Sequence, residues 1–243
     1  MIVAIDGPAG AGKSTVARRL AERLGFRYLD TGAMYRAVTW LALERGVSLE
    51  DGDRLGRLAE EHPVELQDAA GVAIAGTDVT NEIRRAEIDR AVPIVARHPE
   101  VRRVMRERQR ELARIGSAVI EGRDIGTVVC RDAEVKVYLD ADETVRARRR
   151  IEERPEIGAD ALATDLRERD ESDRERTQPA EDAEVIDTSS LEVDDVVEHI
   201  ERLVLERARS MGLDPFRSTG RRRRITGRAR DPGSGHRKRR PRA

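Results

Sequence analysis

The chain has 243 residues, of which 38% are charged and 2% aromatic, and a formal net charge of −1. This length accommodates one sizeable α/β domain with an insertion, or two small domains. The single cysteine excludes an internal disulfide and a cysteine-rich metal site, and no apolar run is long enough for a membrane span. We therefore expect a soluble, cytoplasmic protein with an aliphatic core and a highly charged surface.

The first elements surround a glycine-rich loop. Residues 2–5 are apolar and predict a short buried strand, and residues 16–24 have the spacing of an amphipathic helix. Between them, GPAGAGKST at residues 7–15 fits the phosphate-binding pattern GxxxxGKS. The glycines let several backbone N–H groups point at one phosphate, while Lys13 reaches the β- and γ-phosphates and Ser14 faces Mg²⁺. The predicted nucleotide-phosphate site is Gly7, Pro8, Ala9, Gly10, Ala11, Gly12, Lys13, Ser14 and Thr15.

A second strand is predicted at residues 26–29, followed by a helix that begins at residue 33 and ends at Gly46. In an open parallel sheet, ligands bind at the carboxyl ends of the strands, where Thr31, Tyr35 and Arg36 would lie. Arg36 can hold a second phosphate bidentately, and the alternative is a solvated helix arginine.

The region from about residue 61 to residue 114 has a different pattern. Apolar alternation at 64–66 and 72–75 predicts a hairpin, and 81–114 predicts helix, interrupted at Pro93 and again near Pro99. We interpret this region as a small α+β insertion attached to the sheet. Most of the arginines in its second helix are expected to be solvated or paired with Glu107 and Glu111.

A buried strand at 117–120 leads into Gly122, Arg123 and Asp124. At the end of a parallel strand, this sequence places a cation and a carboxylate beside the phosphate loop, although an ordinary turn with a local ion pair is the alternative. A further strand is predicted at 135–140, followed by an arginine-rich helix.

The last part of the body is strongly charged and then returns to an apolar pattern. Residues 167–176 are too polar for a core helix, and predict either a solvated face or an arginine-bearing lid over two anionic nucleotides. A fifth strand is predicted at 185–187 and a closing helix at 192–211. Because strands and helices alternate, the predicted fold is an α/β, doubly wound, five-stranded parallel sheet.

Residues 215–243 carry 12 Arg or Lys and a single Asp, with no apolar periodicity. This composition predicts a disordered basic tail, which can contact RNA weakly or the acidic body of the protein. A solubilising tail without a partner is the alternative.

Six segments, taken together and in this order, resemble bacterial cytidylate kinase. They are GPAGAGKST, LDTGAMYR at 29–36, GTDVTNEIR at 76–84, EGRDIGTVV at 121–129, VKVYLDA at 135–141 and RERDESDRER at 167–176. The similarity covers about residues 1–210. It implies a P-loop kinase that phosphorylates CMP and dCMP with ATP and Mg²⁺. It also implies a nucleoside-monophosphate kinase domain at 1–214, with a nucleotide-binding insertion at about 61–114 and a helical lid at about 151–178.

The resemblance also implies roles for individual residues. Tyr35, Arg36 and Arg123 would surround the CMP phosphate, with Arg102 beside the cytosine. The remaining acceptor residues would be Asp124 in the acceptor site, Arg169 and Asp173 near the ribose, and Arg176 toward the base. Lys13 and the loop amides would hold ATP, and Arg149 or Arg150 would flank its adenine. Pro93 stands where the family usually has a serine that contacts the base.

In the mechanism that the resemblance implies, a phosphoryl group passes in line from ATP to the CMP phosphate, and the catalytic residues would be Lys13, Arg123, Asp124 and Arg169. The nearest alternative is a kinase of another small acceptor, such as UMP or a non-nucleotide. A GTPase is disfavoured because the chain has no Asn-Lys-x-Asp element and its lysines are Lys13, Lys136 and Lys238. An RNA-binding protein that acts through the tail is the third alternative. We expect a monomer.

Overall fold

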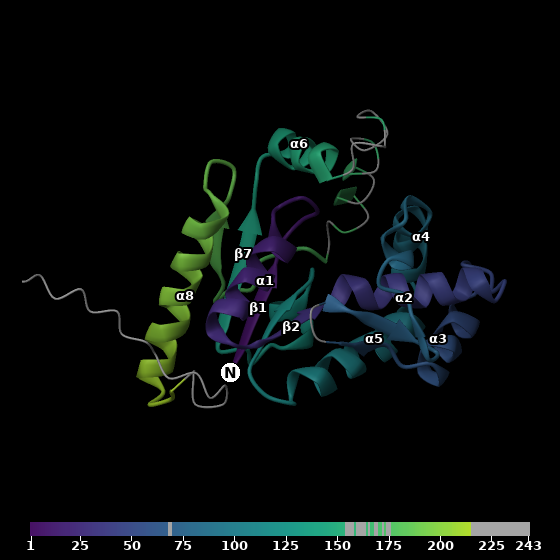
Figure 1. Ribbon diagram of the computed structural model, residues 1–243, viewed down its shortest axis with the longest axis horizontal. Helices are drawn as coiled ribbons and strands as arrows, with labels where there is room; N and C mark the ends of the chain where they lie inside the picture. The colour runs from purple at the N-terminus through teal and green to yellow at the C-terminus, as the bar shows by residue number, and fades with distance from the viewer. Residues whose placement is uncertain are drawn as a thin grey trace, which may run out of the picture.

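The central feature of the computed structural model is a five-stranded sheet with the strand order β2-β6-β1-β7-β8 (Figure 1). All its strand pairs are parallel. The structure describes residues 1–67, 70–153, 158, 164, 166–167, 170–171, 173 and 176–214. The strands of the sheet are β1 (Ile2–Asp6), β2 (Arg27–Asp30), β6 (Ala118–Glu121), β7 (Val135–Asp140) and β8 (Glu184–Asp187). The predicted parallel sheet is confirmed, with small shifts at the ends of individual strands.

Helices cover both faces of this sheet, as a doubly wound fold requires. Val3 and Ile5 of β1 pack in one cluster with α1 (Lys13–Leu24) and α8 (Val193–Ser210). Ala4, which points to the opposite face, packs in a second cluster with α2 (Thr31–Glu44). Successive residues of a strand face opposite sides, so one strand serves two cores.

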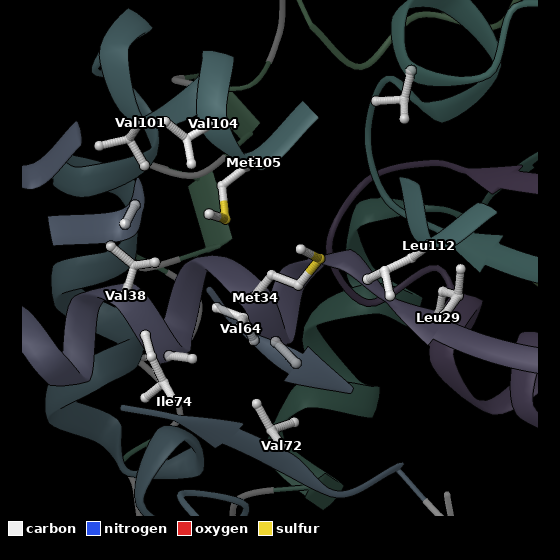
Figure 2. Close-up of a cluster of buried hydrophobic side chains, with 14 of the residues drawn as sticks. Leu29, Met34, Val38, Val64, Val72, Ile74, Val101, Val104, Met105 and Leu112 are labelled. Carbon is white, nitrogen blue, oxygen red and sulfur yellow. The ribbon is translucent and has the colours of Figure 1, made fainter. Parts of the chain in front are cut away.

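A second, antiparallel sheet lies within the second cluster and has the order β3-β4-β5. Its strands are β3 (Glu65–Leu66), β4 (Val72–Ile74) and β5 (Thr77–Asp78). In Figure 2 the labelled side chains of α5 (Pro99–Ala113) lie on one side of α2, and those of β4 on the other. The predicted hairpin is therefore confirmed, and it closes a core that is separate from the one beneath α8.

Two helices in this region differ from the prediction. α3 (Gly52–Glu61) was not expected; Asp51 caps it by accepting from the Arg54 N–H, and Leu55 and Leu58 bury its inner face. The predicted break at Pro93 is wrong, because α4 (Ala86–Ala96) continues through it. Proline removes one helical hydrogen bond, but α4 packs against α2 and buries Ile88 and Val95, which holds the helix together.

The break at Pro99 is confirmed, since α5 begins there with proline in its first turn. The short helix η2 (Glu82–Arg84) precedes α4, and η3 (Ile125–Val129) and α6 (Glu143–Glu153) follow β6 and β7. Figure 1 shows α3 and α4 at the side of the molecule opposite α8. Within the described residues, no helix is both long and apolar enough to span a bilayer.

Candidate active site

The phosphate loop leaves β1 and enters α1 with the conformation that its glycines predict. Gly7, Gly10 and Gly12 all have positive φ angles, of 146°, 78° and 88°. A Cβ on Gly7 would lie 2.0 Å from the Leu139 carbonyl oxygen, and one on Gly10 would lie 2.9 Å from that of Arg146. Any side chain at these positions would push the loop away from its neighbours, so glycine is needed for both backbone angle and space.

Lys13 lies at the centre of this loop. Its Nζ donates to the Pro8 carbonyl oxygen at 2.6 Å. Desolvation, and then the nearby charge of Arg123, lower the pKa of Lys13 to about 7. An anionic phosphate beside the ammonium would favour its charged form, so ligand binding and protonation of Lys13 support each other.

Ser14 is held by a carboxylate from β6. The Ser14 hydroxyl donates to Glu121 Oε2 at 2.8 Å, and the Tyr28 hydroxyl donates to Glu121 Oε1. Glu121 is 4% exposed, and desolvation followed by the charge of Asp30 raises its pKa to about 7. A hydroxyl and a carboxylate are the hard oxygen ligands that Mg²⁺ prefers, so the two residues fit a metal on the phosphate side. Glu121 was not predicted, although its position directly before Gly122 at a strand end was a signal.

Asp6 fixes the segment that follows β6. The buried Asp6 carboxylate accepts from the N–H groups of Ile125 and Gly126, at 2.8 and 2.7 Å. Desolvation raises its pKa to about 6, against the lowering effect of these hydrogen bonds. The contact ties the end of β1 to η3 and so positions Arg123 and Asp124, which precede η3. Asp6 was also not predicted.

Arg123 lies beside the phosphate loop, as its place at a strand end predicts. Its Nη1 donates to the Gly7 carbonyl oxygen at 2.7 Å, and its Nε lies 3.1 Å from Asp173 Oδ2. Asp173 also lies 4.0 Å from Arg176. The cation therefore connects the loop with a residue from the charged segment near residue 173.

The carboxylate of Asp124 forms ion pairs with α5. Its Oδ2 accepts from Arg102 Nη2 at 2.6 Å and from Arg106 Nη2 at 3.1 Å. Arg103 and Arg108 do pair with Glu107 and Glu111, at 3.5 and 3.0 Å. The expectation of solvated or locally paired arginines is thus wrong for Arg102 and Arg106, because both pair with Asp124, which follows the distant strand β6. Of the two, Arg102 also lines the cavity.

Arg36 is not a solvated helix arginine. Its Nε lies 3.2 Å from Oδ1 of Asp89, a residue of α4 that is 3% exposed. Arg150 of α6 approaches the other oxygen of Asp89, at 3.9 Å. Asp89 thus connects α2 with α6 across the cavity and was not predicted. It stands one helical turn before Pro93 on α4, which is the only sequence signal that pointed toward it.

Thr31 and Tyr35 lie at the end of β2 and in α2. The Thr31 hydroxyl donates to the Glu121 carbonyl oxygen at 2.6 Å and is buried. Tyr35 lines the cavity, and desolvation raises its pKa to about 12. At neutral pH Tyr35 is therefore an uncharged hydroxyl that can donate to an anion.

The two arginines predicted near the donor base are separated. Arg149 donates to the Thr188 hydroxyl and carbonyl at 3.0 and 2.6 Å, and Thr188 in turn contacts the Ala11 carbonyl at 3.2 Å. Arg150 instead lines the same cavity as Arg36. Arg149 is thus on the phosphate-loop side and Arg150 on the opposite side. The buried Arg146, which was not predicted as a site residue, donates to the Ala9 carbonyl at 3.2 Å.

These contacts surround one cavity of about 200 Å³. Of the predicted site residues, those that line it are Ala9, Gly10, Lys13, Ser14, Thr31, Tyr35, Arg36, Arg102, Arg123, Asp124, Arg150 and Asp173. Pro93 lines it as well, together with Asp89, Gln109 and Glu121. The predicted residues that do not line it are Gly7, Pro8, Ala11, Gly12, Thr15, Arg149 and Arg176. Arg169 lies outside the described residues. A phosphate loop and a separate set of arginines therefore face one space, which suits transfer between two anions.

Known proteins share both the sequence and the fold. A protein named cytidylate kinase from Shouchella clausii is 50% identical over 218 residues, which cover 85% of this chain and 97% of that protein. The cytidylate kinase of Pelotomaculum thermopropionicum is 50% identical over 210 residues, 82% of this chain and 93% of the relative. A crystal structure of an uncharacterized protein from Eubacterium ventriosum is 14% identical, with a TM-score of 0.50 over 85% of this chain and 98% of that one, and this likeness concerns the fold alone.

The family comparison covers most of the chain. The sequence model described as cytidylate kinase matches residues 3–206. This range contains the phosphate loop, the arginines of the cavity and the five strands of the parallel sheet. The chain is a phosphotransferase with a P-loop kinase fold and belongs to the cytidylate kinase family.

Proposed function

We propose that this protein transfers the γ-phosphoryl group of ATP to the phosphate of CMP or dCMP, giving the diphosphates. The observation that carries the proposal is the shared cavity, in which Lys13 and Ser14 face Arg36, Arg102 and Arg123. Two anionic nucleotides must approach each other for this reaction, and a site with cations on both sides offsets their repulsion. The names of the relatives support cytidine as the acceptor nucleoside.

On the donor side, the N–H groups of residues 7–15 hold the ATP phosphates, and Lys13 stabilises the charge that develops on the transferred group. Arg149 flanks the adenine, a role supported by its place beside Thr188 and the loop. Arg150, the other arginine considered for that role, lies nearer to the acceptor.

On the acceptor side, Tyr35, Arg36 and Arg123 bind the CMP phosphate. The pairing of Arg36 Nε with Asp89 leaves both of its Nη groups available for a bidentate contact. The acceptor oxygen is already ionised at neutral pH, so positioning and charge neutralisation are sufficient and a strong base is not needed.

The nucleoside of the acceptor is bound by other residues. Arg102 and Asp124 face the cytosine, and their contact at 2.6 Å supports a joint role. Thr31 also lines the cavity. Arg169 and Asp173 contact the ribose, and Arg176 lies toward the cytosine. Lys13, Arg123, Asp124 and Arg169 form the catalytic set of this proposal.

The metal of the reaction is Mg²⁺, which the Ser14 hydroxyl and the Glu121 carboxylate would hold. When bound, it supplies positive charge to the phosphoryl group. The hydrogen bond from Ser14 to Glu121 supports this assignment, because it fixes the direction of the hydroxyl lone pairs.

The domain organisation follows from the same proposal. Residues 1–214 form a nucleoside-monophosphate kinase domain, with an acceptor-binding insertion at about 61–114 and a lid at about 151–178. The antiparallel hairpin supports the insertion, whereas much of the lid lies outside the described residues. Residues 215–243, which lie outside the described residues, are basic in sequence and contact RNA weakly in this proposal, and the enzyme acts as a monomer.

A coupled assay of ADP release, run over CMP, dCMP, UMP, AMP, GMP and shikimate, tests the activity. We expect the highest kcat/KM for CMP and dCMP, and no release above background without an acceptor. A higher kcat/KM for any other acceptor would contradict the proposal.

A further inference from the structure

One buried polar side chain in the cavity has no hydrogen-bond partner among the residues that the structure describes. Gln109 of α5 is 3% exposed and lines the cavity with Arg102 and Asp124. Its amide makes no hydrogen bond within the part of the chain that the structure describes. The amide atoms are not among the fully buried polar atoms, so they are open to the cavity. By contrast, the buried Thr31 and Glu121 of the same cavity are both hydrogen-bonded to protein groups.

A side-chain amide carries two N–H donors and an oxygen acceptor. Because these groups are open to the cavity and have no partner among the described residues, water or a bound ligand must satisfy them. Gln109 faces a cavity in which a substrate binds, which makes that substrate the natural partner. It lies two helical turns after Arg102, on the same face of α5.

The chemistry of the amide indicates which part of the substrate it meets. A phosphate offers only acceptors, so the amide oxygen would repel it, and Lys13, Arg36 and Arg123 already supply the donors that a phosphate needs. A pyrimidine edge instead presents a donor beside an acceptor, and one amide matches both at once.

We propose that Gln109 binds the pyrimidine edge of the acceptor nucleotide, an inference that rests on the nucleotide kinase activity proposed above. Its Oε1 accepts from the exocyclic amine of cytosine, and its Nε2 donates to the ring N3. Turned by 180°, the same amide donates to O4 and accepts from N3–H of uracil. Gln109 therefore holds both pyrimidines, and the preference for cytosine is left to other groups such as the Arg102–Asp124 pair.

The first test is Gln109→Met, which keeps the length of the side chain and removes its polarity. KM for CMP and for UMP should both rise by at least about tenfold, while KM for ATP stays unchanged. The melting temperature without ligand should stay the same or rise, because the amide makes no hydrogen bond to the described residues that the substitution would remove. The stabilisation of the protein by CMP alone, in the absence of ATP, should fall in parallel.

A matched control is Leu112→Met, which places the same side chain one turn away on α5. Leu112 is buried but does not line the cavity. Its variant should keep the wild-type KM values, which separates loss of the amide from a general effect of methionine in this helix.

The second test is Gln109→Glu, whose carboxylate can accept but not donate when ionised. It accepts from the cytosine amine but repels the lone pair of N3, and it accepts from N3–H of uracil but repels O4, so kcat/KM should fall by about tenfold for both CMP and UMP. Gln109→Met should likewise lower both values and leave their ratio nearly unchanged, so the two variants must agree.

A Gln109→Met enzyme with a lower melting temperature and wild-type KM values for CMP and UMP would overturn the inference, since the amide would then serve the fold. If Gln109→Glu does not fold, the methionine variant decides alone. Failure of the proposed function is recognised separately, because wild-type enzyme would then phosphorylate neither pyrimidine nucleotide.

Discussion

The two sides of the cavity are built in different ways. On the phosphate-loop side, consecutive backbone groups and three glycines with positive φ form the site. On the acceptor side, side chains from α2, α4, α5 and the end of β6 meet through ion pairs such as Arg36–Asp89 and Arg102–Asp124. Side-chain substitutions on the phosphate-loop side should therefore act locally. Substitutions on the acceptor side should disturb a network of mutually dependent charges.

The largest effect is expected for Lys13→Ala, on the loop side. The variant should fold normally, because the glycines and backbone define the loop, but kcat should fall about 10³-fold or more, since a charge acting on the transferred phosphoryl group is lost. Steady-state kinetics and the melting temperature would be measured together. Activity within about tenfold of wild type would contradict the assigned role of Lys13.

On the acceptor side, Asp124→Asn should affect both activity and stability. Arg102 and Arg106 would lose the carboxylate that they share, and breaking a largely buried ion pair can cost about 3–5 kcal/mol. We expect kcat/KM for CMP to fall about hundredfold and the melting temperature to drop, with little change in KM for ATP. The control is Glu111→Gln, which removes an exposed carboxylate from α5, the helix that carries Arg102 and Arg106. Equal losses in the two variants would show that Asp124 has no special place in the network.

A smaller effect is expected at Pro93, which lines the cavity but carries no hydroxyl. Pro93→Ser would supply one neutral hydrogen bond to the cytosine amine, whose second hydrogen is left by the Gln109 contact, and this bond is worth about 0.5–1.5 kcal/mol, or roughly twofold to twelvefold in selectivity. The ratio of kcat/KM for CMP over UMP should rise accordingly. An unchanged ratio would mean that residue 93 does not meet the base or that another group already satisfies the amine.

The smallest effect on catalysis is expected from truncation after Leu213, which removes the basic tail and leaves both sides of the cavity intact. Phosphorylation of CMP should be unchanged, whereas weak RNA binding should disappear. RNA affinity of the full chain should fall steeply as salt increases, because counterions are released on binding. A truncated enzyme that lost most of its turnover would place the tail in the catalytic body.

Sequence alone was sufficient where the structure depends on consecutive residues. The phosphate loop was predicted with its role because glycine positions and a following helix define it locally. The parallel strands were predicted because each is a short apolar run, and Arg123 because it follows such a run. The helix break at Pro99 was equally local, since proline is suited to a first helical turn.

Tertiary structure decided the contacts between distant segments. Several polar contacts depend on how the helices and strands pack. They are the ion pair of Arg36 with Asp89, the hydrogen bond of Tyr28 to Glu121, and the ion pairs of Asp124 with two arginines of α5. Packing also kept α4 helical through Pro93, against its local tendency to break. A phosphate loop is fixed by the backbone angles of neighbouring residues, which sequence encodes directly. A charged network is fixed by burial and by distances across the core, and these exist only once the chain has folded.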